Sequence, residues 1–212
     1  LMEAETENLF TTAPYPTRNF RHNLADLKAH IAGNEKGVQE LRKMIEHFGL
    51  DVVHAYMKHV QDNAEECVRR VLGVLTDGSY EYEMDSGAKI CVDIKVDRQN
   101  REATIDFTGT SPQQNSNFNA PSSVCMAAVL YVFRLMVDDE IPLNAGCLKP
   151  LNVIIPEDCM LAPKYPAAVV AGNVETSQRL VDVVGPEGTG RRPARPRARP
   201  RPSAPGLWRT AP

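Results

Sequence analysis

Two stretches near the start of the chain repeat apolar residues at the spacing of an amphipathic helix. The first begins near Asn23, with Asp26 where a carboxylate favours the positive end of a helix dipole, and Gly49 is a natural helix stop. Its apolar positions are Leu24, Leu27, Ile31, Val38, Leu41, Ile45 and Phe48. The second stretch carries Val53, Met57, Val60, Ala64, Cys67, Val71 and Leu75. We expect two helices that pack as a hairpin, with Gly33 and Asn34 as the point where the first can divide.

After Asp77 and Gly78 the apolar period changes to two. The alternating positions are Ile90, Val92, Ile94 and Val96, then Ala103, Ile105 and Phe107 after a polar turn at 98–101. This pattern predicts an antiparallel hairpin with one solvated face. The run 124–137 is apolar nearly all round, so it predicts a helix buried centrally, which Ser122 or Ser123 can cap.

The predicted fold class is therefore α+β. We expect an N-terminal helical hairpin, an antiparallel β-hairpin or meander, a buried central helix, and short C-terminal strands at 151–155 and 167–171. Residues 1–22 lack periodicity and are expected to form a connector, and residues 23–184 the ordered domain. Residues 185–212, rich in Arg and Pro, are expected to be a disordered tail because they cannot bury apolar area.

The charge distribution and the cysteines indicate which partners and which cellular compartment to expect. The net charge of −3 divides into +6 from Gly185 onward and −9 before it, and so acidic a body gives no reason to expect nucleic-acid binding. The longest apolar stretch is too short to cross a bilayer, so no membrane partner is expected. The five cysteines are odd in number and include no CxxC pair. Free thiols in a reducing compartment, and hence a cytoplasmic protein, are expected.

Four polar motifs are candidates for chemistry, each with a structural alternative. The loop 106–113, DFTGTSPQ, can offer backbone N–H groups to an anion, or it is a turn after the hairpin; it lacks a Walker pattern. In 115–121, NSNFNAP, Asn119 can recognise a ring amide or shape a turn before the helix.

The other two motifs lie closer to the C-terminus. In 141–150, Asn144 lies beside Cys147, a nucleophile only if a base or a positive environment activates it; all five histidines precede the hairpin, which favours a structural thiol. In 172–178, GNVETSQ, the polar groups form either a substrate-contacting loop or a capped helix start.

In order along the chain, several phrases resemble the hydantoinase B/5-oxoprolinase family over Thr17–Val184. They are NLADLKAHIAGNEKGVQEL, YMKHVQDNAEE, DFTGTSP, FNAP, DEIPLNAGCLKP and AAVVAGNVETSQR. The resemblance implies an enzyme that couples ATP cleavage to opening a cyclic amide, giving glutamate from 5-oxoproline or a carbamoyl amino acid from a hydantoin. It also implies a separate hydantoinase A-type module that binds ATP and phosphorylates the substrate amide oxygen, and a B-type module that completes hydrolysis.

The resemblance also sets expectations for the site. Six residues match family motif positions and are the substrate-binding candidates: Asn119, Asn144, Asn173, Glu175, Thr176 and Ser177. No catalytic role and no metal ligand is assigned. We expect no cofactor on this chain, with ATP and a divalent metal implied for the complete enzyme.

Three further expectations concern the chain as a whole. It begins with Leu1, and the family pattern starts upstream and stops near Val184, so we expect a fragment whose tail is an out-of-frame translation or a diverged end. We also expect an oligomer. The alternatives are an N-methylhydantoinase-type B subunit and a non-catalytic packing or assembly module of a larger complex.

Overall fold

A computed structural model describes residues 2–185 and divides them into two compact units, the first ending at His59 and the second starting at Val60. The predicted disordered tail lies outside the described residues, except for Gly185. The α+β class predicted from the sequence is confirmed. Where the sequence predicts one domain over 23–184, the structure separates the N-terminal helices from the rest.

The first unit contains α1 (Glu3–Thr12), α2 (Phe20–Phe48) and the start of α3 (Leu50–Leu72). The expected connector over residues 1–22 therefore includes a helix. Asn19 caps α2 by accepting a hydrogen bond from the backbone N–H of His22 at 3.3 Å, so α2 begins three residues earlier than the pattern predicts. Gly49 ends it with a φ of 84°, as expected, and its N–H donates to the carbonyl of Ile45.

Helix α2 is continuous, and Gly33 and Asn34 do not divide it. None of its residues is buried. Both helices of the predicted hairpin are present, but the packing expected for α2 is not seen: its apolar side chains stay at the surface of the described structure. The second part of α3 differs, because Ala64, Cys67, Val68 and Leu72 enter the hydrophobic core of the second unit.

The second unit is built on a four-stranded sheet in the order β1-β2-β3-β4. Its strands are β1 (Gly78–Glu83), β2 (Lys89–Asp97), β3 (Glu102–Asp106) and β4 (Leu151–Ile154). The predicted hairpin is β2–β3, with Ile94 opposite Ile105, and β1 extends it as an antiparallel meander. Strand β4 pairs in parallel with β3, a pairing the sequence does not predict. A parallel partner requires a crossover, which α4 (Ser122–Met136) supplies.

The two faces of the sheet are chemically different, as the alternation predicts. Ile90, Val92, Ile94 and Ile105 are buried on the core face. On the opposite face Lys95, Thr104 and Asn152 are exposed or half-buried. The sheet therefore has a single solvated face.

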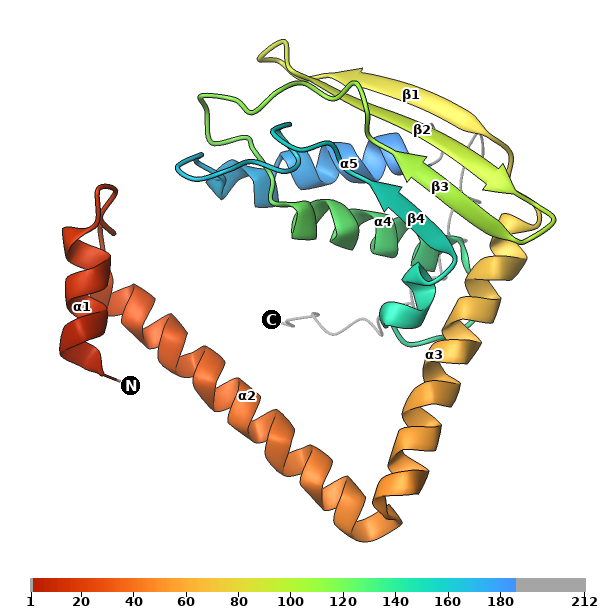
Figure 1. Cartoon of the computed structure of the whole chain (residues 1–212), viewed down its shortest axis with the longest axis horizontal. Helices are drawn as coiled ribbons and strands as arrows, with labels where there is room; N and C mark the ends of the chain where they lie inside the picture. The colour runs from red at the N-terminus through yellow and green to blue at the C-terminus, as the bar shows by residue number, and fades with distance from the viewer. Residues whose placement is uncertain (1, 186–212) are drawn as a thin grey trace, which may run out of the picture. The chain divides into compact units, whose positions relative to one another are not determined.

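Helices α4 and α5 (Thr176–Val184) pack side by side on the core face (Figure 1). Pro121, rather than Ser122 or Ser123, is the N-cap of α4. Helix α4 packs into the core as expected, with Val129 and Phe133 fully buried, but one side of it is open: Tyr131 is 49% and Leu135 64% exposed. Among the described helices, none combines the length and apolar character needed to cross a membrane.

The C-terminal end also differs from the prediction. In place of a second short strand at 167–171, the chain enters a 3-10 turn, η2 (Val170–Asn173), and then α5. Leu180, Val183 and Val184 of α5 are fully buried. Helix α5 therefore begins within the 172–178 motif, and its N-cap, Glu175, makes no side-chain capping hydrogen bond.

Replacing Ile105 with Ala should lower the free energy of unfolding by about 2–5 kcal/mol, because a fully buried side chain leaves a cavity between sheet and helices. Its neighbour Thr104, on the solvated face, is the matched control, and Thr104→Ala should change stability by no more than about 0.5 kcal/mol. Urea denaturation followed by circular dichroism measures both. Equal losses for the two variants would contradict the assignment of faces.

Candidate functional site

Two loops far apart in sequence meet beyond the C-terminal ends of β3 and β4. The backbone N–H of Ala171 donates to the carbonyl of Asn117 at 2.9 Å. We call the contact between residues 115–121 and 169–177 the loop junction. It brings together two of the motifs that the sequence singles out.

Asn119 holds the loop junction through its side-chain amide. Its Oδ1 accepts from the backbone N–H of Gln114 at 2.7 Å, and its Nδ2 donates to the carbonyls of Gln114, Ser116 and Ala168 at 2.9–3.0 Å. The side chain is fully buried. Because both ends of the amide are engaged within the chain, Asn119 acts here as a structural residue.

Gly172 and Thr176 complete the loop junction. A Cβ on Gly172 would lie 2.1 Å from the backbone oxygen of Asn119, so only glycine permits this approach. The buried Thr176 hydroxyl donates to the carbonyl of Phe118 at 2.5 Å. Both residues therefore fix the start of α5 against the loop 115–121, and the Thr176 hydroxyl faces the chain rather than solvent.

Asn173 and Ser177 instead line an open hollow of about 540 Å³ between α4 and α5. Asn173 is exposed, and the half-buried Ser177 hydroxyl donates to the backbone carbonyl of Asn173 at 2.8 Å. Further polar groups come from Ser123, Tyr131, Gln178 and the carboxylate of Asp182, and the apolar part of the lining consists of Val124, Ala127, Ala128 and Val181. A partly apolar lining with a few amide, hydroxyl and carboxylate groups suits a small polar ring.

Glu175 lies in a smaller hollow of about 260 Å³ with Arg179, Tyr82 and Phe118. Its carboxylate is exposed at the N-terminal end of α5. The guanidinium of Arg179 lies 5.3 Å from the centre of the Tyr82 ring and pairs with Asp182 at 2.9 Å. Glu175 and Arg179 thus present opposite charges in one hollow next to the loop junction.

Asn144, the sixth candidate, lies apart from the others. It precedes η1 (Ala145–Leu148), which leads into β4, whereas the loop junction follows the C-terminal ends of β3 and β4. Its Oδ1 accepts from the N–H of Gly146 at 2.7 Å and its Nδ2 donates to the carbonyl of Val60 at 3.4 Å. Asn144 therefore caps η1 and ties it to α3 at the opposite end of the sheet.

The loop 106–113 is a continuation of the sheet rather than an anion cradle. The backbone N–H of Thr108 is bound by the Asp106 carboxylate, that of Thr110 by the carbonyl of Phe107, and that of Ser111 by the carbonyl of Lys89. The Thr110 hydroxyl also bonds both backbone groups of Cys91. With these donors engaged, the loop does not fit the phosphates of ATP.

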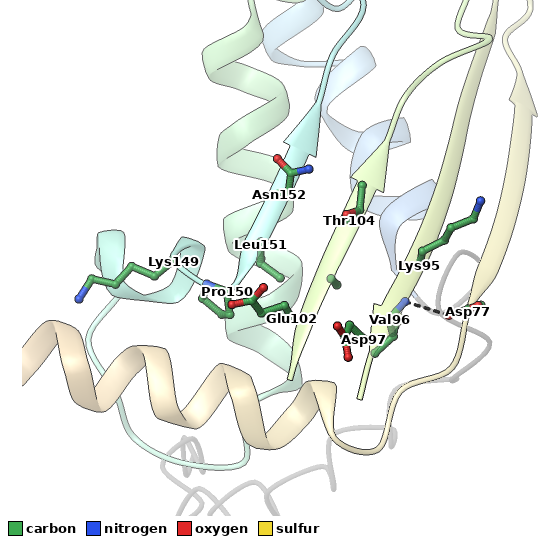
Figure 2. Close-up of a pocket in the computed structure, with 11 residues that line it drawn as sticks. Asp77, Lys95, Val96, Asp97, Glu102, Thr104, Lys149, Pro150, Leu151 and Asn152 are labelled. Carbon is green, nitrogen blue, oxygen red and sulfur yellow. Dashed lines mark hydrogen bonds between the residues drawn. The ribbon is translucent and has the colours of Figure 1, made fainter. Parts of the chain in front are cut away.

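A third hollow, of about 560 Å³, opens at the other end of the sheet, where β2 turns into β3 (Figure 2). Asp97 and Glu102 direct carboxylates into it, while the Lys149 side chain points away. The Lys149 ammonium lies 3.0 Å from the Asp62 carboxylate and 3.3 Å from that of Glu65, and the hydrogen bond that it donates to Asp62 is the main reason that its pKa is raised. Lys149 is therefore held by α3 and is not free to neutralise the hollow.

The cysteines are free and mostly inaccessible. Cys67, Cys125, Cys147 and Cys159 are buried, and Cys91 is half-buried. Burial raises the pKa of Cys125 to about 12. Within residues 2–185 no three His, Cys, Asp or Glu side chains gather as a metal site, so the described part of the chain does not fit the metal implied for the complete enzyme.

The sequence therefore singled out both segments of the loop junction and three residues of the hollows beside it, but it did not predict that the two segments meet. Asn173, Glu175 and Ser177 line hollows, and their substrate-binding role stays a prediction. The sequence analysis did not select Tyr131 or Arg179 as lining residues. Tyr131 lies in an apolar run that is typical of a core helix. Its polar tip in an otherwise apolar run, MAAVLYVF, is the signal that could have found it.

This chain was compared with protein families, with curated proteins and with solved structures. The sequence model of hydantoinase B/oxoprolinase matches residues 2–186. The chain is 45% identical over 178 residues to a 5-oxoprolinase from Dictyostelium discoideum, covering 79% of this chain and 14% of that protein. It is 44% identical over 191 residues to 5-oxoprolinase 1 of Arabidopsis thaliana, covering 82% of this chain and 15% of that protein.

The comparison with solved structures concerns the fold. The fold resembles that of an ATP-dependent caprolactamase from Pseudomonas jessenii with a TM-score of 0.63 and 22% identity, over 85% of this chain and 32% of that one. At that identity the likeness shows the fold alone. The chain spans about one seventh of the length of the two curated relatives.

Asn119→Ala should lower the free energy of unfolding by roughly 2–4 kcal/mol, because it removes a fully buried side chain that bonds the N–H of Gln114 and three backbone carbonyls. Asn115, exposed in the same loop, supplies the control, and Asn115→Ala should be nearly neutral. Urea denaturation of the two variants measures both free energies of unfolding. A stable Asn119→Ala chain would show that the loop junction does not depend on this amide.

Thiol labelling tests the cysteines. Burial, and then the neighbouring Glu81 carboxylate, raise the pKa of Cys91, so it should react slowly with Ellman's reagent at neutral pH and faster as pH rises towards that pKa. The four buried thiols should react only after unfolding. Rapid labelling of native Cys147 at neutral pH would instead indicate an activated nucleophile.

Proposed function

The chain belongs to the hydantoinase B/oxoprolinase family, and from this premise we propose that it is part of the B-type, hydrolytic module of an ATP-dependent enzyme that opens a cyclic amide. The proposed reaction is the conversion of 5-oxoproline to glutamate. The observation that carries the proposal is the 44–45% identity to proteins named 5-oxoprolinase over most of the chain. The caprolactamase likeness supports the fold on which the proposal rests.

We place the substrate in the hollow between α4 and α5. A cyclic amide presents one N–H and one C=O, and the side-chain amide of Asn173 can accept from the first and donate to the second. The Ser177 hydroxyl and Gln178 lie in the same lining, and the apolar lining residues suit the ring methylenes. These residues bind and orient the ring; the exposed Glu175 carboxylate in the adjacent hollow is the nearest candidate for handling a proton.

The nucleotide is proposed to bind elsewhere, on a hydantoinase A-type module. ATP supplies the driving force for opening an unstrained amide. The backbone N–H groups of Thr108, Thr110, Ser111 and Gln113 are engaged within the chain, and the described residues hold no metal-ligating cluster. Both observations support a division of labour in which this chain handles the ring and its partner handles the phosphates.

Two other functions are kept because particular observations favour them. The family includes hydantoinase B proteins, so a hydantoin is the alternative substrate, and it offers the same N–H and C=O pair. The engagement of Asn119, Asn144 and Thr176 in structural hydrogen bonds favours a non-catalytic packing module. Steady-state kinetics with 5-oxoproline and with hydantoin distinguish the two substrates from each other and from a packing role.

A chimera gives the sharpest test. Residues 17–184 of this chain would replace the matching segment of the Dictyostelium discoideum 5-oxoprolinase, and glutamate release from 5-oxoproline and ATP would be measured. In the chimera, Asn173→Ala and Ser177→Ala should each lower kcat/KM by roughly 3- to 10-fold through a lost hydrogen bond. Asn115→Ala, exposed in the loop 115–121, should leave kcat and KM unchanged.

The outcomes distinguish the candidates. If the chimera is active and its kcat/KM does not change when Asn173, Glu175 or Ser177 is replaced by Ala, this segment has a packing role. If the chimera turns over hydantoin in preference to 5-oxoproline, hydantoin replaces 5-oxoproline as the proposed substrate. ATP-dependent turnover by the 212-residue chain alone would refute the proposed need for a separate module.

A further inference from the structure

The smaller hollow beside the loop junction carries charges of both signs, and we call it the charged hollow. Its charged members are Asp85, Glu175 and Arg179, and its apolar part consists of Tyr82, Met84 and Phe118. The carboxylates of Asp85 and Glu175 make no hydrogen bond and no ion pair with any residue between 2 and 185. With a volume of about 260 Å³, the charged hollow suits a ligand of few atoms.

Glu175 and Arg179 have the spacing of an ion pair but do not form one in the described structure. An acidic residue four positions before a basic one on a helix normally pairs with it, as two such pairs on α3 do. On α5 the guanidinium of Arg179 instead lies 5.3 Å from the centre of the Tyr82 ring, and its Nη1 donates to Asp182 at 2.9 Å. The opposite charges of the charged hollow are therefore held apart.

The Arg179 guanidinium keeps one edge open for a carboxylate. A guanidinium has five N–H donors, and the hydrogen bonds that Arg179 makes within residues 2–185 use Nη1 alone. Nε–H and Nη2–H lie side by side on another edge, where they form a fork that matches the two oxygens of a carboxylate. Because the Tyr82 ring and Asp182 already hold the side chain, little further side-chain entropy is lost on binding.

The two free carboxylates decide which kind of ligand fits. A simple anion would contact Arg179 but would also meet the like charges of Asp85 and Glu175, which disfavour it. A ligand that carries an ammonium group next to its carboxylate makes favourable contacts with both signs of charge. An α-amino acid carries these two groups on one carbon, so it is the ligand class that the charged hollow matches.

We propose that the charged hollow binds a free α-amino acid, with Arg179 on its carboxylate and Glu175, assisted by Asp85, on its ammonium. The choice of L-glutamate as this amino acid rests on the proposed function. Water added across the C–N bond of 5-oxoproline releases an amine, which is protonated at neutral pH, whereas ring opening of a hydantoin gives an uncharged carbamoyl nitrogen. The charged hollow therefore receives the product of 5-oxoproline opening, with the γ-carboxylate directed to solvent.

Isothermal titration calorimetry of the full 212-residue chain with L-glutamate at neutral pH is the test. One glutamate should bind per chain. Arg179→Gln and Glu175→Gln should each weaken binding by roughly 10- to 100-fold, because each variant loses hydrogen bonds between charged groups. The control, Arg70→Gln, removes the same charge from an exposed position on α3 and should bind as the wild type does. Circular dichroism checks that all variants keep their helices.

Changes to the ligand distinguish direct contacts from a loosened fold. The α-amide of glutamate lacks the carboxylate assigned to Arg179, and glutarate lacks the ammonium assigned to Glu175. Both ligands should bind the wild-type chain at least roughly 10-fold more weakly than glutamate. Arg179→Gln should not weaken the α-amide further, and Glu175→Gln should not weaken glutarate further, because the contact is already absent.

Three results would each overturn the proposal: no glutamate binding, unchanged affinity in Arg179→Gln or Glu175→Gln, or an equal loss for glutamate and its α-amide in Arg179→Gln. Turnover by the chimera is a separate measurement. An active chimera without glutamate binding by the chain would remove the amino-acid site and leave the proposed function in place. Glutamate binding without turnover would keep the site and remove the proposed function.

Discussion

The second unit depends on one buried amide. Asn119 joins the loop after β3 to the turn before α5 by hydrogen bonds that only a side chain with both a donor and an acceptor can make. Without them backbone groups of Gln114, Ser116 and Ala168 would lose this partner, at a cost in the free energy of folding. Both hollows at the C-terminal end of the sheet are bordered by residues whose positions follow from this contact.

The same contact changes how the family motifs are to be understood. Polar residues in the matching phrases divide into those turned inward, such as Asn119 and Thr176, and those that reach an open hollow, such as Asn173 and Ser177. Motif membership alone does not distinguish them, because a polar side chain that stabilises a turn and one that contacts a ligand are drawn from the same residue types. Burial and hydrogen bonding separate the two groups here.

The first unit shows the complementary situation, in which an apolar pattern has no partner within the described chain. Amphipathic helices normally gain their stability by covering such a stripe. In α2 the apolar side chains of Ile31, Val38 and Leu41 are exposed in the described structure.

Local patterns in the sequence determined the helices at 20–48, 50–72 and 122–136, the β2–β3 hairpin, the stop at Gly49 and the family resemblance, because periodicity and turn chemistry act over a few neighbouring residues. Only the tertiary structure decided that β4 runs parallel to β3, that the 3-10 turn η2 stands where a second short strand is predicted, that α4 is exposed on one side, and that Asn144 lies away from Asn119. Each of these depends on contacts between segments distant in sequence, whose free energy no local pattern contains.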